Sequence, residues 1–387
     1  MIRPEGRVRI ELRAPGDRML ADRLRRAARR LALALRTPAL LALSILRRRA
    51  PAPPPARVSR ILVVRTDRLG DMALTTAALQ DLRDHFRRAE ITVLAPAPSL
   101  DILEGHPAVD RRAGLDRRGL PDGFVGRFDL AIDFTPDASL RGALLVARSR
   151  AKYRAGFAAS GRQALFNLKC PPADPRRHVF DLNRDLVAAL GAPPRAERPS
   201  LFVTPEERGG ARALLAALGA ASPRVAVHPG GHFPSQRWSP ERFGDLITLL
   251  TGRTGAACIV VHGPGEEDLA ERVCAASPDA LRAGPRSVRD LMALLAVCDL
   301  FIGNNSGPLH ISGALGLPTV SVMGPTDPGR FTPRGPEDRV VRHDLPCSPC
   351  DRGRCWHHTC LRGVEPEELL REAEEAVKSL RPREEAL

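Results

Sequence analysis

Two aspartates that closely follow an apolar run are the first residues in the chain with an evident chemical use. The run Arg60–Arg65 predicts a buried strand, and Asp67 and Asp71 come after it, with Gly70 allowing a tight turn between them. A carboxylate at the end of a strand can take the proton of a hydroxyl nucleophile. It can also cap the start of a helix and complement the helix dipole. The spacing leaves both interpretations open for each aspartate.

A glycine-rich segment in the second half of the chain has the composition of a phosphate-binding loop. It begins at His228 and reads HPGGHFPSQRWSP, so backbone N–H groups and the guanidinium of Arg237 can meet an anion. Turns rich in Gly and Pro between a strand and a helix are common, so the pattern alone does not identify a ligand. We expect Trp238, in the same segment, to pack in the interior.

A third segment combines small polar residues with the start of a predicted helix. In GNNSGPLH, Asn305 and Ser306 can cap a helix that Pro308 helps to begin. An anion placed before Gly307 would meet free amides and the positive end of the helix dipole. A capped helix without any ligand is the alternative, and we expect His310 to be a structural histidine of the interior.

Four of the eight cysteines fall within one short segment near the C-terminus. They are spaced C-x2-C-x4-C-x4-C, with two histidines in the same loop. Such a group can assemble a structural zinc site, which takes Cys and His ligands in tetrahedral geometry, although the spacing is not that of a standard zinc finger. Free thiols and a disulfide are the alternatives, the disulfide being less favoured in a reducing cytosol. The candidate ligands are Cys347, Cys350, Cys355 and Cys360, and the histidines are His357 and His358.

These segments need a scaffold, and the chain predicts one of alternating strands and helices, which is typical of parallel βαβ units. The expected strands span residues 60–65, 91–95, 128–133, 224–228, 257–262, 299–303 and 319–323. The expected helices include residues 72–86, 181–190, 240–250, 266–275, 288–296, 308–315 and 366–380. The predicted fold class is therefore α/β, with two Rossmann-like, doubly wound domains facing a cleft. Ligands of such sheets lie beyond the carboxyl ends of the strands.

The predicted division of the chain begins with a basic extension, residues 1–56. Residues 1–50 hold 14 arginines and 4 acidic residues, which accounts for +10 of the net charge of +14. Arginines flank an apolar run there, so we expect residues 20–50 to lie as an amphipathic segment on an anionic membrane surface. A poorly ordered tail is the alternative. Residues 57–200 and 201–387 would form the two domains.

Composition excludes several classes of protein. No uncharged apolar stretch reaches about 18 residues, so an ordinary transmembrane span is not expected. Eight cysteines in 387 residues are too few for a disulfide-stapled scaffold. Aromatic residues make up only 4% of the chain and the positive charge is concentrated at one end, so we expect no nucleic-acid partner.

Four segments, in their order along the chain, resemble glycosyltransferase family 9, the heptosyltransferases that build the inner core of lipopolysaccharide. They are ILVVRTDRLGDMALTTAAL, VAVHPGG followed by SQRWSPERF, VVHGPGEED, and DLFIGNNSGPLHISGALGLPTVSVMGPTDP. The resemblance covers the chain from about residue 59 to residue 380. It implies a GT-B architecture, with an N-terminal acceptor domain and a C-terminal donor domain. It also implies an inverting transfer that requires no cofactor.

The resemblance implies roles for residues on both sides of the cleft. Asp71 takes the place of the catalytic base. Arg237 stands where a basic residue, often Lys, contacts the phosphates of the donor. Ser306 and Gly307 match the phosphate contacts at a helix start. A hydroxyl would thus be deprotonated on one side of the cleft while the diphosphate is held on the other.

Two further positions concern the donor. Asn305 stands where the family usually has Asp, and this difference removes a negative charge near the donor sugar. Either Glu266 or Glu267 corresponds to the acidic residue that holds the ribose of the adenosine. We expect transfer of a heptose from ADP-heptose to a lipid-linked lipopolysaccharide core or related cell-envelope glycan. The protein would be cytoplasmic and peripheral on the inner face of the bacterial inner membrane. A GT-B transferase for another nucleotide sugar and a non-catalytic sugar-nucleotide-binding protein are the alternatives.

Overall fold

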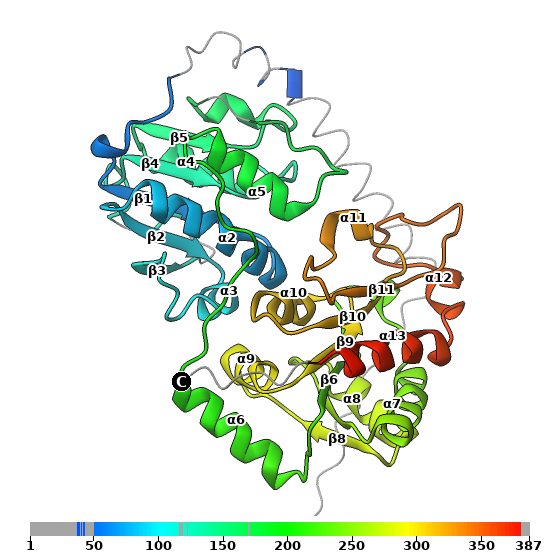
Figure 1. Ribbon diagram of the computed structural model, residues 1–387. Helices are drawn as coiled ribbons and strands as arrows, with labels where there is room; N and C mark the ends of the chain where they lie inside the picture. The colour runs from blue at the N-terminus through cyan, green and yellow to red at the C-terminus, as the bar shows by residue number, and fades with distance from the viewer. Residues whose placement is uncertain are drawn as a thin grey trace, which may run out of the picture.

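The computed structural model describes residues 37, 38, 40, 42, 50–115, 119–121, 123–168 and 171–380. The expected membrane-binding segment, residues 20–50, lies almost wholly outside the described residues. Secondary structure in the described part falls into two parallel β-sheets that carry helices and stand next to each other (Figure 1). None of the helices described has both the length and the apolar character needed to cross a lipid bilayer.

The first sheet has the strand order β3-β2-β1-β4-β5. Its strands are β1 (Arg60–Val64), β2 (Glu90–Ala95), β3 (Arg111–Gly114), β4 (Leu130–Asp133) and β5 (Tyr153–Gly156). Its helices are α2 (Leu69–His85), α3 (Ala97–Asp101), α4 (Arg141–Arg148) and α5 (Val179–Ala188), with short 3₁₀ turns η1 (Pro55–Arg57) and η2 (Arg162–Leu165). The central strands are buried almost throughout, because parallel strands packed on both faces read as apolar runs.

The second sheet has the order β11-β10-β9-β6-β7-β8. Its strands are β6 (Arg224–His228), β7 (Ala257–Val261), β8 (Ala280–Ala283), β9 (Leu300–Asn304), β10 (Thr319–Val322) and β11 (Arg339–Val341). Its helices are α6 (Pro205–Ala217), α7 (Pro240–Thr254), α8 (Glu267–Ala276), α9 (Val288–Ala296), α10 (Gly307–Ala314), α11 (Pro328–Phe331), α12 (Thr359–Arg362) and α13 (Pro366–Ser379), and η3 (Pro234–Gln236) is a 3₁₀ turn.

Both sheets are doubly wound, which confirms the predicted fold class. Every strand pairing is parallel, and the strand order reverses between β1 and β4 and between β6 and β9. Four short strands, β3, β5, β8 and β11, were absent from the sequence-based expectation. Each of them carries an arginine in three or four residues, so no apolar run marks it.

Helix α2 begins at Leu69 rather than at Met72, which corrects the expected start and places Asp71 inside the first turn. Oδ2 of Asp71 accepts the backbone N–H of Arg68 at 3.4 Å, as in a capping box. An acidic side chain in the first turn also complements the helix dipole. The capping interpretation of Asp71 is therefore confirmed. The cap engages Oδ2 and leaves Oδ1 for other contacts.

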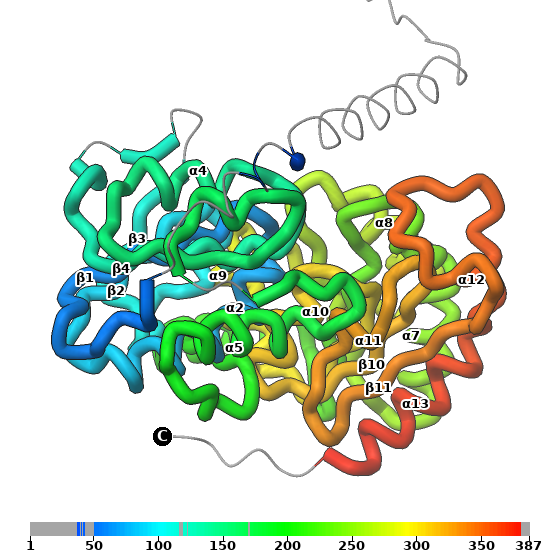
Figure 2. The backbone as a smooth tube through the Cα atoms, turned by 90° about the horizontal axis from the view of Figure 1, so that it is seen from above, coloured from blue at the N-terminus to red at the C-terminus, as the bar shows by residue number. Residues whose placement is uncertain are grey.

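The two halves of the molecule meet where α2 packs against α10, and these helices lie next to each other in Figure 2. The approach is close at Gly70, because a Cβ at this position would lie 2.6 Å from Cδ2 of His310. A second tie joins Nε2 of His178 to the carbonyl oxygen of Thr332 at 2.9 Å. The connection between the halves runs from α5 to α6, and the domain boundary at residue 200 stays a prediction.

Candidate active site

Two cavities lie between the halves, and one of them contains four of the seven residues predicted to be catalytic or donor-binding, namely Asp71, Asn305, Ser306 and Gly307. This cleft, of about 480 Å³, lies beyond the carboxyl ends of β1, β6 and β9, where doubly wound sheets bind ligands. Both halves contribute to its walls. They are Arg68, Leu69, Gly70 and Asp71 from the first half, and His232, Phe233, Gln236, Asn305, Ser306, Gly307, Pro308, His310, Thr326, Arg330, Phe331 and Asp351 from the second.

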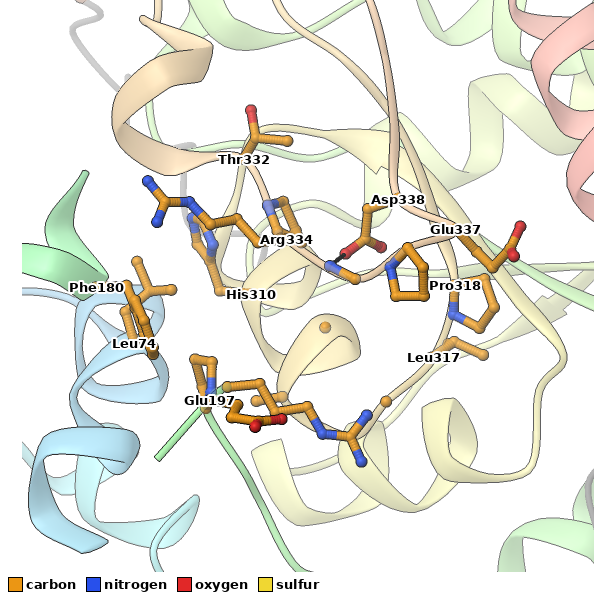
Figure 3. Close-up of a pocket in the computed structure, with 18 of the residues that line it drawn as sticks. Leu74, Phe180, Glu197, His310, Leu317, Pro318, Thr332, Arg334, Glu337 and Asp338 are labelled. Atoms are coloured by element: carbon orange, nitrogen blue, oxygen red, sulfur yellow. Dashed lines mark hydrogen bonds between the residues drawn. The ribbon is translucent and has the colours of Figure 1, made fainter. Parts of the chain in front are cut away.

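The other cavity is slightly larger, at about 520 Å³, and shares His310 with the cleft. Figure 3 shows Phe180, Glu197, Arg334 and Asp338 around it, from α5, from the connection before α6 and from the segment before β11. Apart from His310, none of the residues singled out in the sequence lines this cavity. The cleft is therefore the candidate active site.

A buried guanidinium holds both aspartates of the first segment. Arg65 follows β1 and is only 1% exposed. Its Nε donates to Oδ1 of Asp67 at 2.6 Å, and its Nη2 lies 3.4 Å from Oδ1 of Asp71. Its Nη1 donates to the carbonyl of Phe134 at 2.5 Å and to Oδ1 of Asn183 at 3.2 Å. With its guanidinium fixed on several sides, Arg65 restricts the direction of the Asp71 carboxylate.

The two aspartates differ in their surroundings, which separates their roles. Asp71 lines the cleft, whereas Asp67 is not among the residues of its walls. Burial raises the pKa of Asp67 to about 7, although the positive charge of Arg65 acts in the opposite direction. Asp71 is therefore the aspartate that lines the cleft, and Asp67 shares with it the guanidinium of Arg65.

The start of helix α10 faces the cleft without a side-chain cap, contrary to the expectation that Asn305 or Ser306 would cap it. The hydroxyl of Ser306 lies 3.2 Å from Nδ1 of His228 instead. Oδ1 of Asn305 is buried and has no hydrogen-bond partner among the described residues. The amides of the first turn, beginning at Gly307, therefore keep the positive end of the helix dipole exposed to the cleft.

The two candidate glutamates occupy different environments. Oε1 of Glu266 accepts the N–H of Gly231 at 3.0 Å, and Oε2 accepts the N–H of Gly263 at 3.0 Å and lies 3.1 Å from Nε2 of His228. Burial alone would raise the pKa of Glu266, but these hydrogen bonds outweigh it and lower the pKa to about 2. Glu267, by contrast, is exposed at the start of α8. Glu266 thus ties together the loops that follow β6 and β7.

Arginines surround the cleft from three directions. Arg237 lies beside the cleft rather than in its wall, and its Nε donates to the carbonyl of Gly231 at 2.8 Å, so the guanidinium keeps its Nη groups for an anion. Arg68, from the first half, lies over the ring of Phe233 in the second, with Cζ 5.1 Å from the centroid. Arg330 completes the set. Arg68 and Arg330 share the cleft walls with Asp71 and Asp351, and Arg330 lies 3.5 Å from Asp351.

Trp238 is confirmed as a structural residue, whereas His310 is buried but lines both cavities, and its Nδ1 has no hydrogen-bond partner among the described residues. Trp238 is 1% exposed, and its Nε1 donates to the carbonyl of Val364 at 3.1 Å. His310 is buried against Gly70, and burial lowers its pKa to about 4, so the imidazole is neutral at physiological pH.

The four cysteines near the C-terminus do not gather into a group of metal ligands in the described part of the chain. Cys347 and Cys350 are exposed, Cys355 is half-buried and Cys360 is buried, and all four are free thiols. Across residues 171–380, as elsewhere in the described chain, no three His, Cys, Asp or Glu side chains gather as metal ligands would. Tetrahedral zinc needs sulfur or nitrogen atoms at about 2.0–2.3 Å from one point. The loop instead distributes its thiols between surface and interior.

Comparison with known proteins places this fold and cleft in one family. Residues 125–360 match glycosyltransferase family 9 (heptosyltransferase), and the chain belongs to this family. Lipooligosaccharide heptosyltransferase 2 of Campylobacter jejuni is 28% identical over 167 residues, which are 40% of this chain and 51% of that relative. The chain thus spans about half the length of that relative.

Two solved structures share the architecture. The family 9 glycosyltransferase of Veillonella parvula has a TM-score of 0.73 and 22% identity, covering 83% of this chain and 97% of that one. The ADP-heptose lipopolysaccharide heptosyltransferase II of E. coli has a TM-score of 0.70 and 22% identity, covering 82% and 98%. The likeness confirms the expected GT-B fold of two parallel-sheet α/β domains.

Sequence reasoning gave no role to Arg65 or to Asn183. A signal for Arg65 existed, because an arginine that ends an apolar strand and precedes two aspartates is typical of a buried ion pair. Asn183 carries no such signal. It lies 118 residues further along the chain, and only the packing of α5 brings it to Arg65.

Glu266 makes the stability of the second half depend on pH. Its pKa in the fold lies at about 2, below the ordinary value of 4.5, so its contribution of about 3 kcal/mol is present above pH 4.5 and is lost as the pH falls from 4.5 towards 2. We expect Glu266→Gln to lower the urea midpoint at pH 7 and to differ little from the wild type near pH 2. Exposed Glu267→Gln is the matched control. Equal midpoint losses for Glu266→Gln at both pH values would contradict the assignment.

Proposed function

We propose that this protein is an inverting heptosyltransferase that transfers a heptose from ADP-heptose to a lipopolysaccharide core or a related cell-envelope glycan. One observation carries the proposal. A carboxylate, Asp71, and an uncapped helix start at Ser306 and Gly307 line the same cleft from opposite halves. Membership of family 9 supports this choice, as does the likeness to a solved enzyme whose name includes ADP-heptose.

The reaction is a displacement at the anomeric carbon of the donor sugar. Asp71 takes the proton of the acceptor hydroxyl while the new C–O bond forms on one face of that carbon. The bond to the diphosphate breaks on the opposite face and its electron pair leaves with the diphosphate oxygen, so the configuration inverts. The amides at the start of α10 and the guanidinium of Arg237 stabilise the charge that develops there. These groups supply the positive charge, and the proposed step requires no cofactor.

The nucleotide lies along the loops after β6 and β7 in this proposal. The Glu266 carboxylate accepts contacts from Gly231, Gly263 and His228, which leaves one of its four accepting positions, on Oε1, for a ribose hydroxyl. Glu267, the other candidate, is exposed. The buried and unpartnered Oδ1 of Asn305 can accept a hydroxyl of the donor sugar.

The acceptor is lipid-linked and enters from the first half of the molecule, on the Asp71 side. The protein acts from the cytoplasm, at the inner face of the inner membrane, and residues 20–50 hold it to anionic lipid. A transferase for another nucleotide sugar remains the second candidate. The observation in its favour is Asn305, a neutral amide where the family resemblance leads us to expect a carboxylate.

Binding of nucleotide sugars separates the two candidates. Isothermal calorimetry with ADP-heptose, UDP-sugars and GDP-sugars should give the tightest binding for ADP-heptose. Arg237→Gln should weaken that binding by about tenfold to a hundredfold, because a charge-assisted contact to phosphate is lost. Arg286→Gln, at an arginine that is 93% exposed elsewhere in the second half, should have no effect. Tighter binding of a UDP- or GDP-sugar would select the second candidate.

The base assignment is tested by Asp71→Asn. Asn keeps the helix cap but takes no proton, so transfer should fall by about a hundredfold or more while the affinity for ADP survives. Radiolabelled heptose transfer measures the first quantity and calorimetry the second. Asp84→Asn, at an exposed aspartate of the same helix, is the control. Full transfer activity in the Asp71 variant would refute the assignment.

A further inference from the structure

The loop between β11 and α12 presents one large apolar side chain to solvent. Trp356 is 90% exposed, the highest value among the large apolar side chains that the structure describes. The next most exposed, Val125, reaches 54%. The indole contacts the neighbouring ring of His357 edge to face, with centroids 4.9 Å apart, and is otherwise open. An indole kept in water is costly, which points to a binding surface.

Three arginines lie close to Trp356 along the chain. Arg352 and Arg354 precede it in the loop and Arg362 follows in α12, and all three are exposed. Within the described chain none of them has an ion-pair partner, although pairs are common elsewhere on the surface. The one acidic residue in this stretch, Asp351, lies 3.5 Å from Arg330. We call Arg352, Arg354, Trp356 and Arg362 the Trp356 surface.

The loop that carries the Trp356 surface is anchored on the body of the second half. The hydroxyl of Ser348 donates to the carbonyl of Gly324 at 2.6 Å, and the N–H of Cys350 donates to the carbonyl of Pro325 at 2.9 Å. Gly353 lies so close to Phe233 that a Cβ at Gly353 would be 2.8 Å from its ring. The orientation of the loop is therefore fixed by the fold.

We propose that the Trp356 surface binds an anionic phospholipid bilayer, with the indole in the headgroup region and the three guanidinium groups on lipid phosphates. Tryptophan concentrates at membrane interfaces because its ring is apolar and its N–H is polar. Arginines beside it add attraction to anionic lipid. This inference rests on the proposed function in one respect: the proposed lipid-linked acceptor gives the protein a reason to lie on a membrane.

The position of the loop explains why a bilayer is the favoured partner. Its inner side forms part of the cleft, through Asp351 and through the packing of Gly353 on Phe233. Its outer side, drawn in orange beside α12, projects from the edge of the second half (Figures 1 and 2). A bilayer on the outer side would bring the edge of the cleft to the surface from which the acceptor sugar extends.

Tryptophan fluorescence tests the proposal directly on the full-length chain. The chain has two tryptophans, of which Trp238 is buried and Trp356 is exposed. Vesicles that contain phosphatidylglycerol should shift the emission to shorter wavelength, and brominated acyl chains should quench it. Vesicles of phosphatidylcholine alone should give weaker effects. In Trp356→Phe, which retains only Trp238, the emission should not respond to either vesicle.

Vesicle flotation gives the affinities. Trp356→Ala should weaken binding to phosphatidylglycerol vesicles by about tenfold. This is the loss of affinity expected when roughly half of a large apolar side chain is no longer buried in the membrane. Arg352→Gln and Arg354→Gln should each weaken it by about fivefold, with the effect vanishing at high salt. Leu214→Ala, at a leucine that is 46% exposed on α6, and Arg286→Gln are the matched controls and should bind as the wild type does.

Each outcome decides the proposal. Vesicle binding without a change in Trp356 emission would assign membrane attachment to another segment and overturn it. Absence of vesicle binding would also overturn the proposal, and a protein would then be the alternative partner of the Trp356 surface. Transfer to a delipidated, water-soluble acceptor, which Trp356→Ala should leave unchanged, tests the proposed function separately. A protein that binds vesicles through Trp356 but transfers no heptose would retain this inference and lose the proposed function.

Discussion

The guanidinium of Arg65 is the charge on which the first half of the cleft depends. A buried arginine left without partners would destabilise the fold by about 3–5 kcal/mol, so its carboxylate and carbonyl contacts are obligatory. They tie the end of β1 to the residue after β4, to α5 through Asn183, and to α2 through Asp71. The guanidinium of Arg65 therefore both stabilises the fold and orients a residue of the cleft. The arrangement that satisfies the buried charge also directs a carboxylate into the cleft.

The N-termini of helices α2 and α10 meet at the cleft, and they differ in whether a side chain caps them. The start of α2 carries Asp71 in its first turn, whereas the start of α10 has no side-chain cap. A Cβ at Gly70 would lie 3.4 Å from Cα of Gly307, so the two N-termini are close. Each brings the positive end of a dipole. Because one of these ends already has a carboxylate, a bound anion is favoured at the other.

Much of the fold could be predicted because buried parallel strands are continuous apolar runs, as in β1, β6 and β9. The meeting of Asp71 with Ser306 followed from the rule that ligands lie at the carboxyl ends of such strands. Spacing alone did not separate Asp67 from Asp71, and the choice of Asp71 came from the family resemblance. The packing around Arg65, which holds both carboxylates, leaves only Asp71 in the wall of the cleft. The cysteine spacing left zinc, free thiols and a disulfide open, and the structure has the thiols free. Spacing limits which thiols can meet, but the path of the loop decides whether they do.

The contact between Arg68 and Phe233 joins the two halves of the molecule across the cleft. A cation–π contact of this kind at a surface contributes about 0.5–1 kcal/mol, which corresponds to roughly a two- to fivefold preference for the contacted arrangement. The Arg68 side chain therefore favours the ring only weakly and can leave it under ordinary thermal motion. An anion in the cleft can therefore draw the Arg68 guanidinium away from the ring at little cost, while the packing of α2 on α10 and the hydrogen bond from His178 to Thr332 still join the two halves.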